Sequence, residues 1–201
     1  MIRLGVLISG GGSNLQAIID AIEKGALDAN IKLVVSSKRD AFGLTRAGAA
    51  GIPTLALSKD DYDDPVAADE RIASALLEAQ VDYVVMAGYM RKVLSPLLET
   101  FPNRVINLHP ALLPSFPGAH GIADAFAYGV KFTGVTIHFA NEDYDRGAII
   151  AQEAVVITEA DTLESLEERI HAVEHELYPR VLQLIAQDRV VIGEDSKVRI
   201  L

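Results

Sequence analysis

The sequence predicts an α/β fold with three layers: a mostly parallel central sheet, helices on both faces and a Rossmann-like N-terminal half. Two observations lead to this prediction. Short runs rich in β-branched residues alternate with longer segments in which apolar residues recur three and four positions apart. In the first half these runs are apolar on both faces, as strands covered by helices on both sides must be. Such alternation is typical of a parallel sheet with right-handed crossovers.

The first half supplies most of the predicted strands and three helices. The strands cover residues 4–8, 31–36, 83–86 and 105–108, with a short addition at 54–57 after a Gly-Ile-Pro turn. The helical period predicts helices over residues 14–22, 42–50 and 65–78.

The second half has a different pattern. Strand-like runs at 134–139 and 149–157 are joined by a polar stretch, 140–148, which has the character of a functional loop. A long helix follows, because residues 161–164 fit a capping box and an apolar stripe continues to Ile185. Pro179 lies inside this pattern, so we expect a kink or a break near Tyr178. The irregular stretch 114–121 predicts a surface loop.

Composition limits the classes of function. Two hundred and one residues, 50% hydrophobic and 23% charged, fit one globular domain over 1–201. The absence of cysteine excludes disulfides, thiolate metal sites and a cysteine nucleophile. A net charge of −10 argues against a general surface for nucleic acid or anionic membrane. The apolar opening is too short for a signal peptide and no long apolar run follows, so we expect a soluble, cytoplasmic protein.

A glycine-rich turn, Ser9-Gly10-Gly11-Gly12-Ser13-Asn14, lies between the first strand and the first helix. Glycines let a ligand approach the backbone, and a helix N-terminus offers free N–H groups to a phosphate. The spacing matches neither a dinucleotide fingerprint nor a P-loop. The alternative is a tight turn in which Ser13 or Asn14 only caps the helix.

Two polar residues, Asn107 and His109, end a predicted strand and project to the same side of it. A carboxamide and an imidazole placed together can polarise a carbonyl and stabilise an oxyanion. The carboxyl edge of an open α/β sheet is also where ligands bind. The alternative is that both side chains only satisfy nearby backbone groups.

The acidic loop that includes Asp145 has three interpretations. Its oxygens could hold a divalent cation, although the spacing is not that of an EF-hand. One of its aspartates could pair with His109 and keep the imidazole charged. The loop could also be a solvated turn. Further on, His171 and His175 are four apart, but the residues between them exclude a zinc-protease motif, and Glu174 could contact a ligand or form a salt bridge.

The order and spacing of these motifs resemble the phosphoribosylglycinamide formyltransferases, the folate-dependent glycinamide ribonucleotide transformylases of purine biosynthesis. The matching segments are residues 8–18, 41–44, 87–91, 107–114, 134–150 and 174–179. The resemblance covers essentially the whole chain. It implies a formyltransferase fold with a phosphate-binding half, 1–100, and a folate-binding and catalytic half, 101–201.

The resemblance also implies a reaction and a set of site residues. Such enzymes move a formyl group directly from 10-formyltetrahydrofolate, a co-substrate, to the amine of a ribose phosphate substrate, with no metal. The implied catalytic residues are Asn107, His109 and Asp145. The implied substrate-binding residues are Gly12, Ser13, Asn14 and Glu174. The implied folate-binding residues are Met90, Arg91, Lys92, Val93, Asn107, Ala140, Asn141, Glu142, Asp143 and Tyr144.

In the implied mechanism the amine attacks the formyl carbon, and Asn107 and a protonated His109 stabilise the oxyanion. Asp145 would raise the pKa of His109 and orient its ring. The chain departs from the family at residues 62–65, where relatives carry a basic residue and this sequence has none. Lys59 and Arg71 are the cations on either side.

Three other functions are alternatives to this one. A methionyl-tRNA formyltransferase would carry a further domain and a basic surface, which the charge of −10 contradicts. A formyltetrahydrofolate hydrolase would use the same three catalytic residues with water as the acceptor. A non-enzymatic phosphate-binding module would use only the glycine turn. The expected partners are small molecules, and the expected assembly is a monomer or a homodimer.

Overall fold

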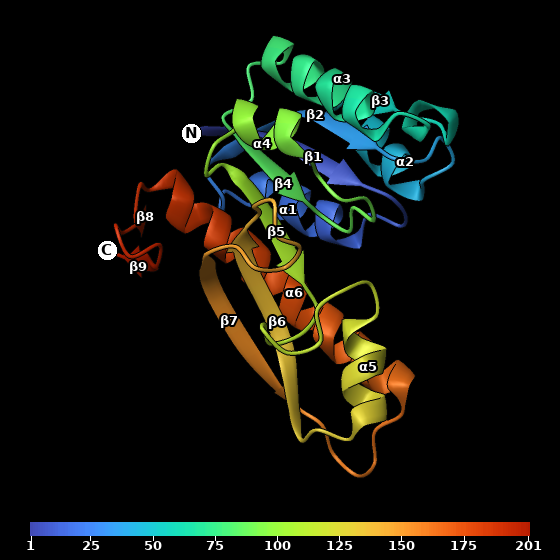
Figure 1. Cartoon of the computed structure of the whole chain (residues 1–201), viewed down its shortest axis with the longest axis vertical. Helices are drawn as coiled ribbons and strands as arrows, with labels where there is room; N and C mark the ends of the chain where they lie inside the picture. Colours follow the sequence, from blue (N-terminus) through green and yellow to red (C-terminus); the bar gives the residue numbers. More distant parts are fainter.

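The computed structural model describes residues 1–201 and contains a seven-stranded sheet in the order β3-β2-β1-β4-β5-β6-β7 (Figure 1). The first five strands are parallel, and β6 and β7 are antiparallel to their neighbours. The sheet strands are β1 (Ile2–Ile8), β2 (Ala29–Ser36), β3 (Thr54–Ala56), β4 (Tyr83–Met86), β5 (Val105–His109), β6 (Phe132–Phe139) and β7 (Ile149–Val156). The predicted mostly parallel sheet is therefore confirmed.

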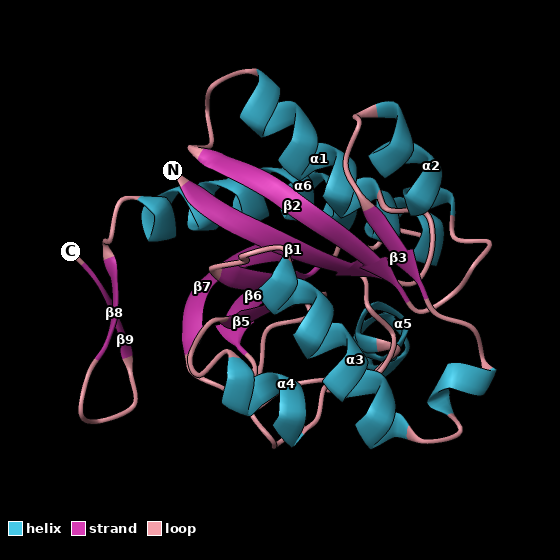
Figure 2. Cartoon of the chain, turned by 90° about the horizontal axis from the view of Figure 1, so that it is seen from above, coloured by secondary structure: helices cyan, strands magenta, loops and turns pink.

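Helices cover both faces of this sheet, as predicted (Figure 2). They are α1 (Ser13–Glu23), α2 (Phe42–Ala49), α3 (Pro65–Glu78), α4 (Ser95–Thr100), α5 (Gly121–Tyr128) and α6 (Leu163–Ala186), with a 3-10 turn η1 (Asp60–Tyr62). One buried cluster joins the sheet to α1, α2, α5 and α6, and the other joins it to α3 and α4. No helix has the length and apolar character to span a membrane.

Strand β1 shows how the apolar runs of the first half are used. Leu4, Val6 and Ile8 pack in the cluster with α1 and α6, whereas Leu7 packs in the cluster with α3. All four side chains have no exposed surface. Because successive strand residues point to opposite faces, a run that is apolar at every position places β1 at the centre of the sheet.

Four short elements are absent from the sequence prediction: η1, α4, α5 and a terminal hairpin formed by β8 (Val190–Ile192) and β9 (Val198–Ile200). Helix α4 has six residues with a proline in its first turn, and α5 begins at a glycine that ends the irregular stretch 114–121. A helix of one or two turns offers too few apolar repeats for a period to be recognised. Tertiary packing stabilises such elements more than local propensity does.

Of the kink or break expected near Tyr178, the break is wrong, because α6 runs without interruption from Leu163 to Ala186 with Pro179 inside it. Residues on both sides of the proline are buried, and the fully buried Tyr178 hydroxyl lies 3.1 Å from the Met86 carbonyl oxygen and 3.0 Å from that of Ile106. This packing offsets the backbone hydrogen bond that proline cannot make.

The capping box at the start of α6 is shifted by one residue from its predicted place. It pairs Thr162 with Ser165, whereas the Asp161 carboxylate accepts hydrogen bonds from Thr158 and Arg169. Because Asp161 is already engaged by these groups, Thr162 is the residue that caps the helix.

The chain order reverses between β1 and β4. From β1 the sheet grows through β2 to β3 on one side, and through β4 to β5 on the other. The connections that leave β1 and β4 therefore diverge at the carboxyl ends of the strands. Such a switch point opens a crevice in which ligands bind.

Candidate active site

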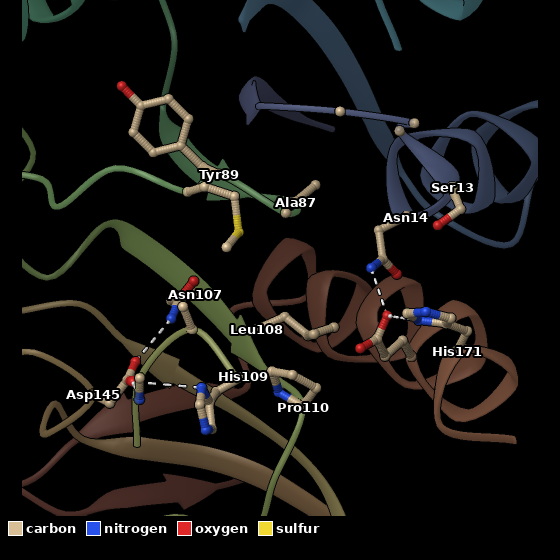
Figure 3. Close-up of a pocket in the computed structure, with 18 of the residues that line it drawn as sticks. Ser13, Asn14, Ala87, Tyr89, Asn107, Leu108, His109, Pro110, Asp145 and His171 are labelled. Atoms are coloured by element: carbon tan, nitrogen blue, oxygen red, sulfur yellow. Dashed lines mark hydrogen bonds and ion pairs between the residues drawn. The ribbon is translucent and has the colours of Figure 1, made fainter. Parts of the chain in front are cut away.

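A cavity of about 290 Å³ lies at this switch point, at the carboxyl ends of β1, β4 and β5 (Figure 3). It brings together residues from all four motifs recognised in the sequence. Its lining is formed by Gly10, Gly11, Gly12, Ser13, Asn14, Ala87, Gly88, Tyr89, Met90, Asn107, Leu108, His109, Pro110, Gly118, Ala119, Tyr144, Asp145, His171 and Glu174. Neither lysine nor arginine lines it, so any anion bound here depends chiefly on backbone amides and histidine.

The glycine turn directs its amides into this cavity because its carbonyls are held on the opposite side. The Gly10 carbonyl accepts the Gly43 N–H at 3.0 Å, and the Gly11 carbonyl accepts Nε of Arg46 at 2.9 Å. In a trans peptide the N–H points away from the C=O of the same peptide unit. The N–H groups of Gly11 and Gly12 therefore face away from α2. Gly12 adopts a left-handed φ of 70°. The turn thus forms a nest of free amides at the start of α1, a geometry that suits an anion.

The buried carboxylate of Glu174 closes one side of the cavity. Its Oε2 accepts a hydrogen bond from Asn14 Nδ2 at 2.8 Å and lies 3.0 Å from Nδ1 of His171 (Figure 3). The hydrogen bond from this carboxylate raises the pKa of His171 above its usual value. His171 lines the cavity, and its raised pKa means that Glu174 favours positive charge on this ring.

Asn107 and His109 both face Asp145 across the cavity (Figure 3). Nδ2 of Asn107 lies 3.5 Å from Asp145 Oδ1, and Nδ1 of His109 lies 3.4 Å from Oδ2. The other ring nitrogen of His109 is 2.8 Å from the Phe116 carbonyl. A carbonyl only accepts, so this Nε2 carries a proton. The structure therefore brings the three implied catalytic residues together.

The pKa of His109 is lower than expected from the sequence analysis. Burial of the imidazole lowers this pKa, and the nearby Asp145 carboxylate and the Phe116 carbonyl raise it by less. Asp145 raises this pKa, as expected from the sequence, but burial lowers it by more, so the expected net rise is wrong for the ligand-free site. Only 3% of His109 is exposed, and desolvation disfavours the charged form of the ring.

Asp145 remains ionised despite its burial. Burial raises the pKa of its carboxyl, but His138, the Gly118 N–H and His109 together outweigh this effect and bring the pKa below its usual value. The Gly118 N–H donates to Oδ2 at 2.9 Å, and Nε2 of His138 lies 3.8 Å from Oδ1. A lasting negative charge in this position favours development of positive charge nearby.

The implied folate-binding segments lie beside a second, much smaller cavity. It measures about 20 Å³, room for roughly one water molecule, between the chain after β4 and the loop after β6. Lys92, Val93, Asn107, Ala140, Asn141, Asp143, Tyr144 and Asp145 line it, with Met86 and His138. Tyr144 lines the main cavity as well, and Met90 lines the main cavity alone. A ring system could enter only if the two segments separated.

Two implied folate-binding residues lie outside both cavities. The Arg91 guanidinium stacks over the Tyr62 ring at 4.3 Å, and the Glu142 carboxylate is 3.4 Å from Ser95 Oγ. Residues 62–65 lack the basic residue of the family, and the cations on either side do not line the cavities. Arg71 pairs with Asp61 at 2.6 Å, and Lys59 lines neither cavity. Pro65 itself begins α3 after an Asp cap, where proline fits well.

Three parts of the site carried no assignment from sequence. His138 lies opposite Asn107 in the β5–β6 pair and 3.1 Å from its amide nitrogen. The loop 114–121, predicted only as a surface loop, supplies the Phe116 carbonyl and the Gly118 N–H. His171 faces Glu174. The one signal in the sequence for any of these parts was a histidine, His138, inside the apolar run that forms β6.

An α/β sheet with free amides and a histidine–carboxylate pair at one edge is typical of enzymes that act on small, polar molecules. This chain belongs to the formyl transferase family, whose model, described as Formyl transferase, matches residues 2–182.

Named relatives agree with this assignment. The chain is 40% identical over 183 residues to a phosphoribosylglycinamide formyltransferase of Bacillus subtilis, covering 91% of this chain and 94% of the relative. It is 42% identical over 196 residues to the human trifunctional purine biosynthetic protein adenosine-3, covering 98% of this chain but 19% of that protein. The chain thus spans about a fifth of the length of the trifunctional relative.

Solved structures show the same fold over all or most of the chain. Glycinamide ribonucleotide transformylase 1 from Symbiobacterium toebii superposes with a TM-score of 0.96 at 46% identity, covering 100% of this chain and 94% of that one. A phosphoribosylglycinamide formyltransferase from Bacillus halodurans gives a TM-score of 0.89 at 44% identity, covering 91% and 94%.

Proposed function

We propose that this protein transfers the formyl group of 10-formyltetrahydrofolate to the amine of 5′-phosphoribosylglycinamide in purine biosynthesis. One observation carries the proposal: an anion-binding nest and the Asn107–His109–Asp145 cluster line the same cavity. A substrate with a phosphate at one end and a nucleophilic amine at the other would span these two features. The names of the Bacillus subtilis and human relatives support this choice of substrate.

The substrate phosphate would bind at the nest. The amides of Gly11, Gly12 and Ser13 have no hydrogen-bond partner within the protein, and the positive end of the α1 dipole lies behind them. Asn14 is held by Glu174, whose carboxylate would face the amine end of the substrate. His171 would add a partial positive charge to a site otherwise free of cations.

The folate would be held largely by backbone groups between β4 and α4. The N–H and C=O groups of Arg91, Lys92 and Val93 form no hydrogen bond with the rest of the chain. A pterin edge presents alternating donors and acceptors, which such free backbone groups can match. The folate thus fits the residues present, provided that the loop 140–144 moves away from residues 92 and 93 to widen the 20 Å³ cavity.

The formyl group would then lie between the amine and the polar cluster. As the amine forms a C–N bond, the formyl oxygen gains negative charge, and the Asn107 amide and the Nε2–H of His109 would donate to it. The Phe116 carbonyl now accepts that Nε2–H, so loop 114–121 must release it. A neutral imidazole suffices as a donor, which agrees with the lowered pKa of His109.

A proton must finally move from the new ammonium to the leaving nitrogen of the folate. The ionised carboxylate of Asp145 stabilises positive charge beside the reacting atoms, and a water molecule would carry the proton. The C–N bond to the folate breaks, leaving a formamide and tetrahydrofolate. A cytoplasmic location, small-molecule partners alone and a monomeric or homodimeric assembly complete the proposal.

The test is formyl transfer from 10-formyltetrahydrofolate, followed by absorbance with and without glycinamide ribonucleotide. Turnover that depends on this acceptor is the expected result. Formate release without an acceptor would mean that the protein is a hydrolase. No reaction in either case, with phosphate compounds still bound, would leave a phosphate-binding module and overturn the proposal.

A further inference from the structure

The chain between β4 and α4 has an unusual set of supports. Residues 87–94 form neither helix nor strand, yet two of their backbone N–H groups bind buried side chains. The Met90 N–H donates to Ser9 Oγ at 2.8 Å, and the Leu94 N–H donates to Asp69 Oδ2 at 2.5 Å. The free backbone of residues 91–93 lies between these two anchors.

The first anchor connects three strand ends. Ser9 follows β1 directly, is 3% exposed and is the first residue of the glycine-rich turn. Its hydroxyl lies 2.6 Å from that of Ser37, which follows β2 and is equally buried. Since each hydroxyl offers a single hydrogen, the pair orients the Ser9 oxygen while it accepts the Met90 N–H.

The second anchor is a buried carboxylate with one hydrogen-bond partner. Asp69 of α3 is 2% exposed, and the Leu94 N–H is the only donor that reaches it. The paired hydroxyls of Tyr62 and Tyr89, 2.7 Å apart, lie in the same region, and neither donates to it. Burial raises the pKa of Asp69 to about 6. Burial of a carboxylate with a single hydrogen-bond partner costs free energy, so a contribution to stability alone does not explain Asp69.

We propose that Ser9 and Asp69 are positioning residues for the folate: they fix both ends of the segment so that the backbone groups of residues 91–93 stay free to bind the co-substrate. The inference rests on the proposed function and deepens it. An unsupported segment would satisfy its own donors by turning inward or binding water. The free enzyme would then have to reorder the segment on binding, which lowers affinity for the folate alone.

The test compares the dissociation constants of tetrahydrofolate and of glycinamide ribonucleotide by calorimetry, alongside the KM of each substrate. We expect Ser9→Ala and Asp69→Ala each to weaken folate binding about 3–10-fold, the worth of one hydrogen bond. Binding of the ribonucleotide should stay within about two-fold, because the nest is held by other contacts. Asp69→Asn keeps an oxygen for the Leu94 N–H and should restore most of the folate affinity.

Two matched variants control for a merely structural effect. Ser36→Ala removes a fully buried hydroxyl that donates to the Lys38 carbonyl at 2.7 Å, at the same end of β2. Asp82→Asn alters a carboxylate that accepts the Arg3 N–H at 2.8 Å, at the far end of β4. Both should lower the melting temperature without separating the two dissociation constants.

The inference is overturned if the parent transfers formyl groups and the anchor variants retain its folate affinity. It is equally overturned if the affinities for folate and ribonucleotide fall together. If the parent binds no tetrahydrofolate, both the inference and the proposed function fail. Acceptor-dependent turnover of the parent, measured first, tells these results apart.

Discussion

Asn14 at the start of α1 donates a hydrogen bond of 2.8 Å to Glu174 in α6, 160 residues later in the chain. The bond joins the glycine-rich turn to the helix that covers the same face of the sheet, and 3% of Glu174 is exposed. The proposed substrate site is therefore built from both ends of the sequence. Removal of this carboxylate should affect binding and stability together.

Glu174→Ala is expected to weaken binding of glycinamide ribonucleotide and to cost about 1–3 kcal/mol of unfolding free energy, because it leaves the buried Asn14 amide without its acceptor. The same change should lower the pKa of His171, whose elevation comes first from its hydrogen bond with Glu174. Titration of the His171 ring by NMR measures this directly. An unchanged His171 pKa in the variant would contradict the contact.

His109→Ala should reduce kcat about 10²–10⁴-fold, the usual worth of a positioned proton donor. Substrate dissociation constants should change little, because the imidazole acts mainly on the charge that develops during transfer. His120→Ala is the matched control, since this exposed imidazole lies in loop 114–121, which contacts His109, and lines neither cavity. A kcat loss of similar size in the control would point to loop disruption instead.

Gly12→Ala should destabilise the protein, whereas Gly11→Ala should not. A Cβ at Gly12 would lie 2.7 Å from the Gly43 Cα, and the φ of 70° strains any other residue, at about 1–3 kcal/mol. A Cβ at Gly11 meets no atom within 4 Å. Chemical denaturation of both variants provides the comparison. Equal stability of the two would contradict the left-handed turn.

The sequence predicted those features that depend on local pattern. The alternation of apolar runs located the central strands, and the glycine turn with the Asn107–His109 pair located two walls of the cavity. Features set by tertiary contact could not be predicted in this way. The role of His138 comes from its cross-strand place opposite Asn107, and the role of Phe116 comes from a loop fold that no period describes.

The charge of His109 is a second example of this limit. Its proximity to an aspartate favours a charged ring, and burial favours a neutral one, so the sign depends on how deeply the ring lies. Burial is the larger effect here. The continuity of α6 through Pro179 is similar, because it depends on tertiary contacts such as those of the Tyr178 hydroxyl with backbone carbonyls of β4 and β5. Neither the pKa shift of His109 nor the continuity of α6 can be predicted from the sequence pattern alone.

Stability should depend on pH through Asp69. Its carboxyl has a pKa of about 6 in the folded chain against 3.8 for an ordinary aspartate, so the folded state binds more protons between these values. The stabilisation from this proton is fully present below pH 4 and is lost as the pH rises through 6. Asp69→Asn removes the dependence. The stability of the parent relative to this variant should therefore fall between pH 4 and pH 7, as urea denaturation at each pH would measure.

The Tyr178 hydroxyl is the last point to test, because it ties α6 to the strands that carry the site. It is fully buried and lies within hydrogen-bond distance of the carbonyls that end β4 and lie within β5, at Met86 and Ile106. Tyr178→Phe should cost about 1–3 kcal/mol, since the two buried carbonyls lose the one hydroxyl hydrogen within their reach. Tyr128→Phe, at an 80% exposed position, should change stability by less than about 0.5 kcal/mol. Equal denaturation midpoints for the two variants would show that α6 is held by apolar packing alone.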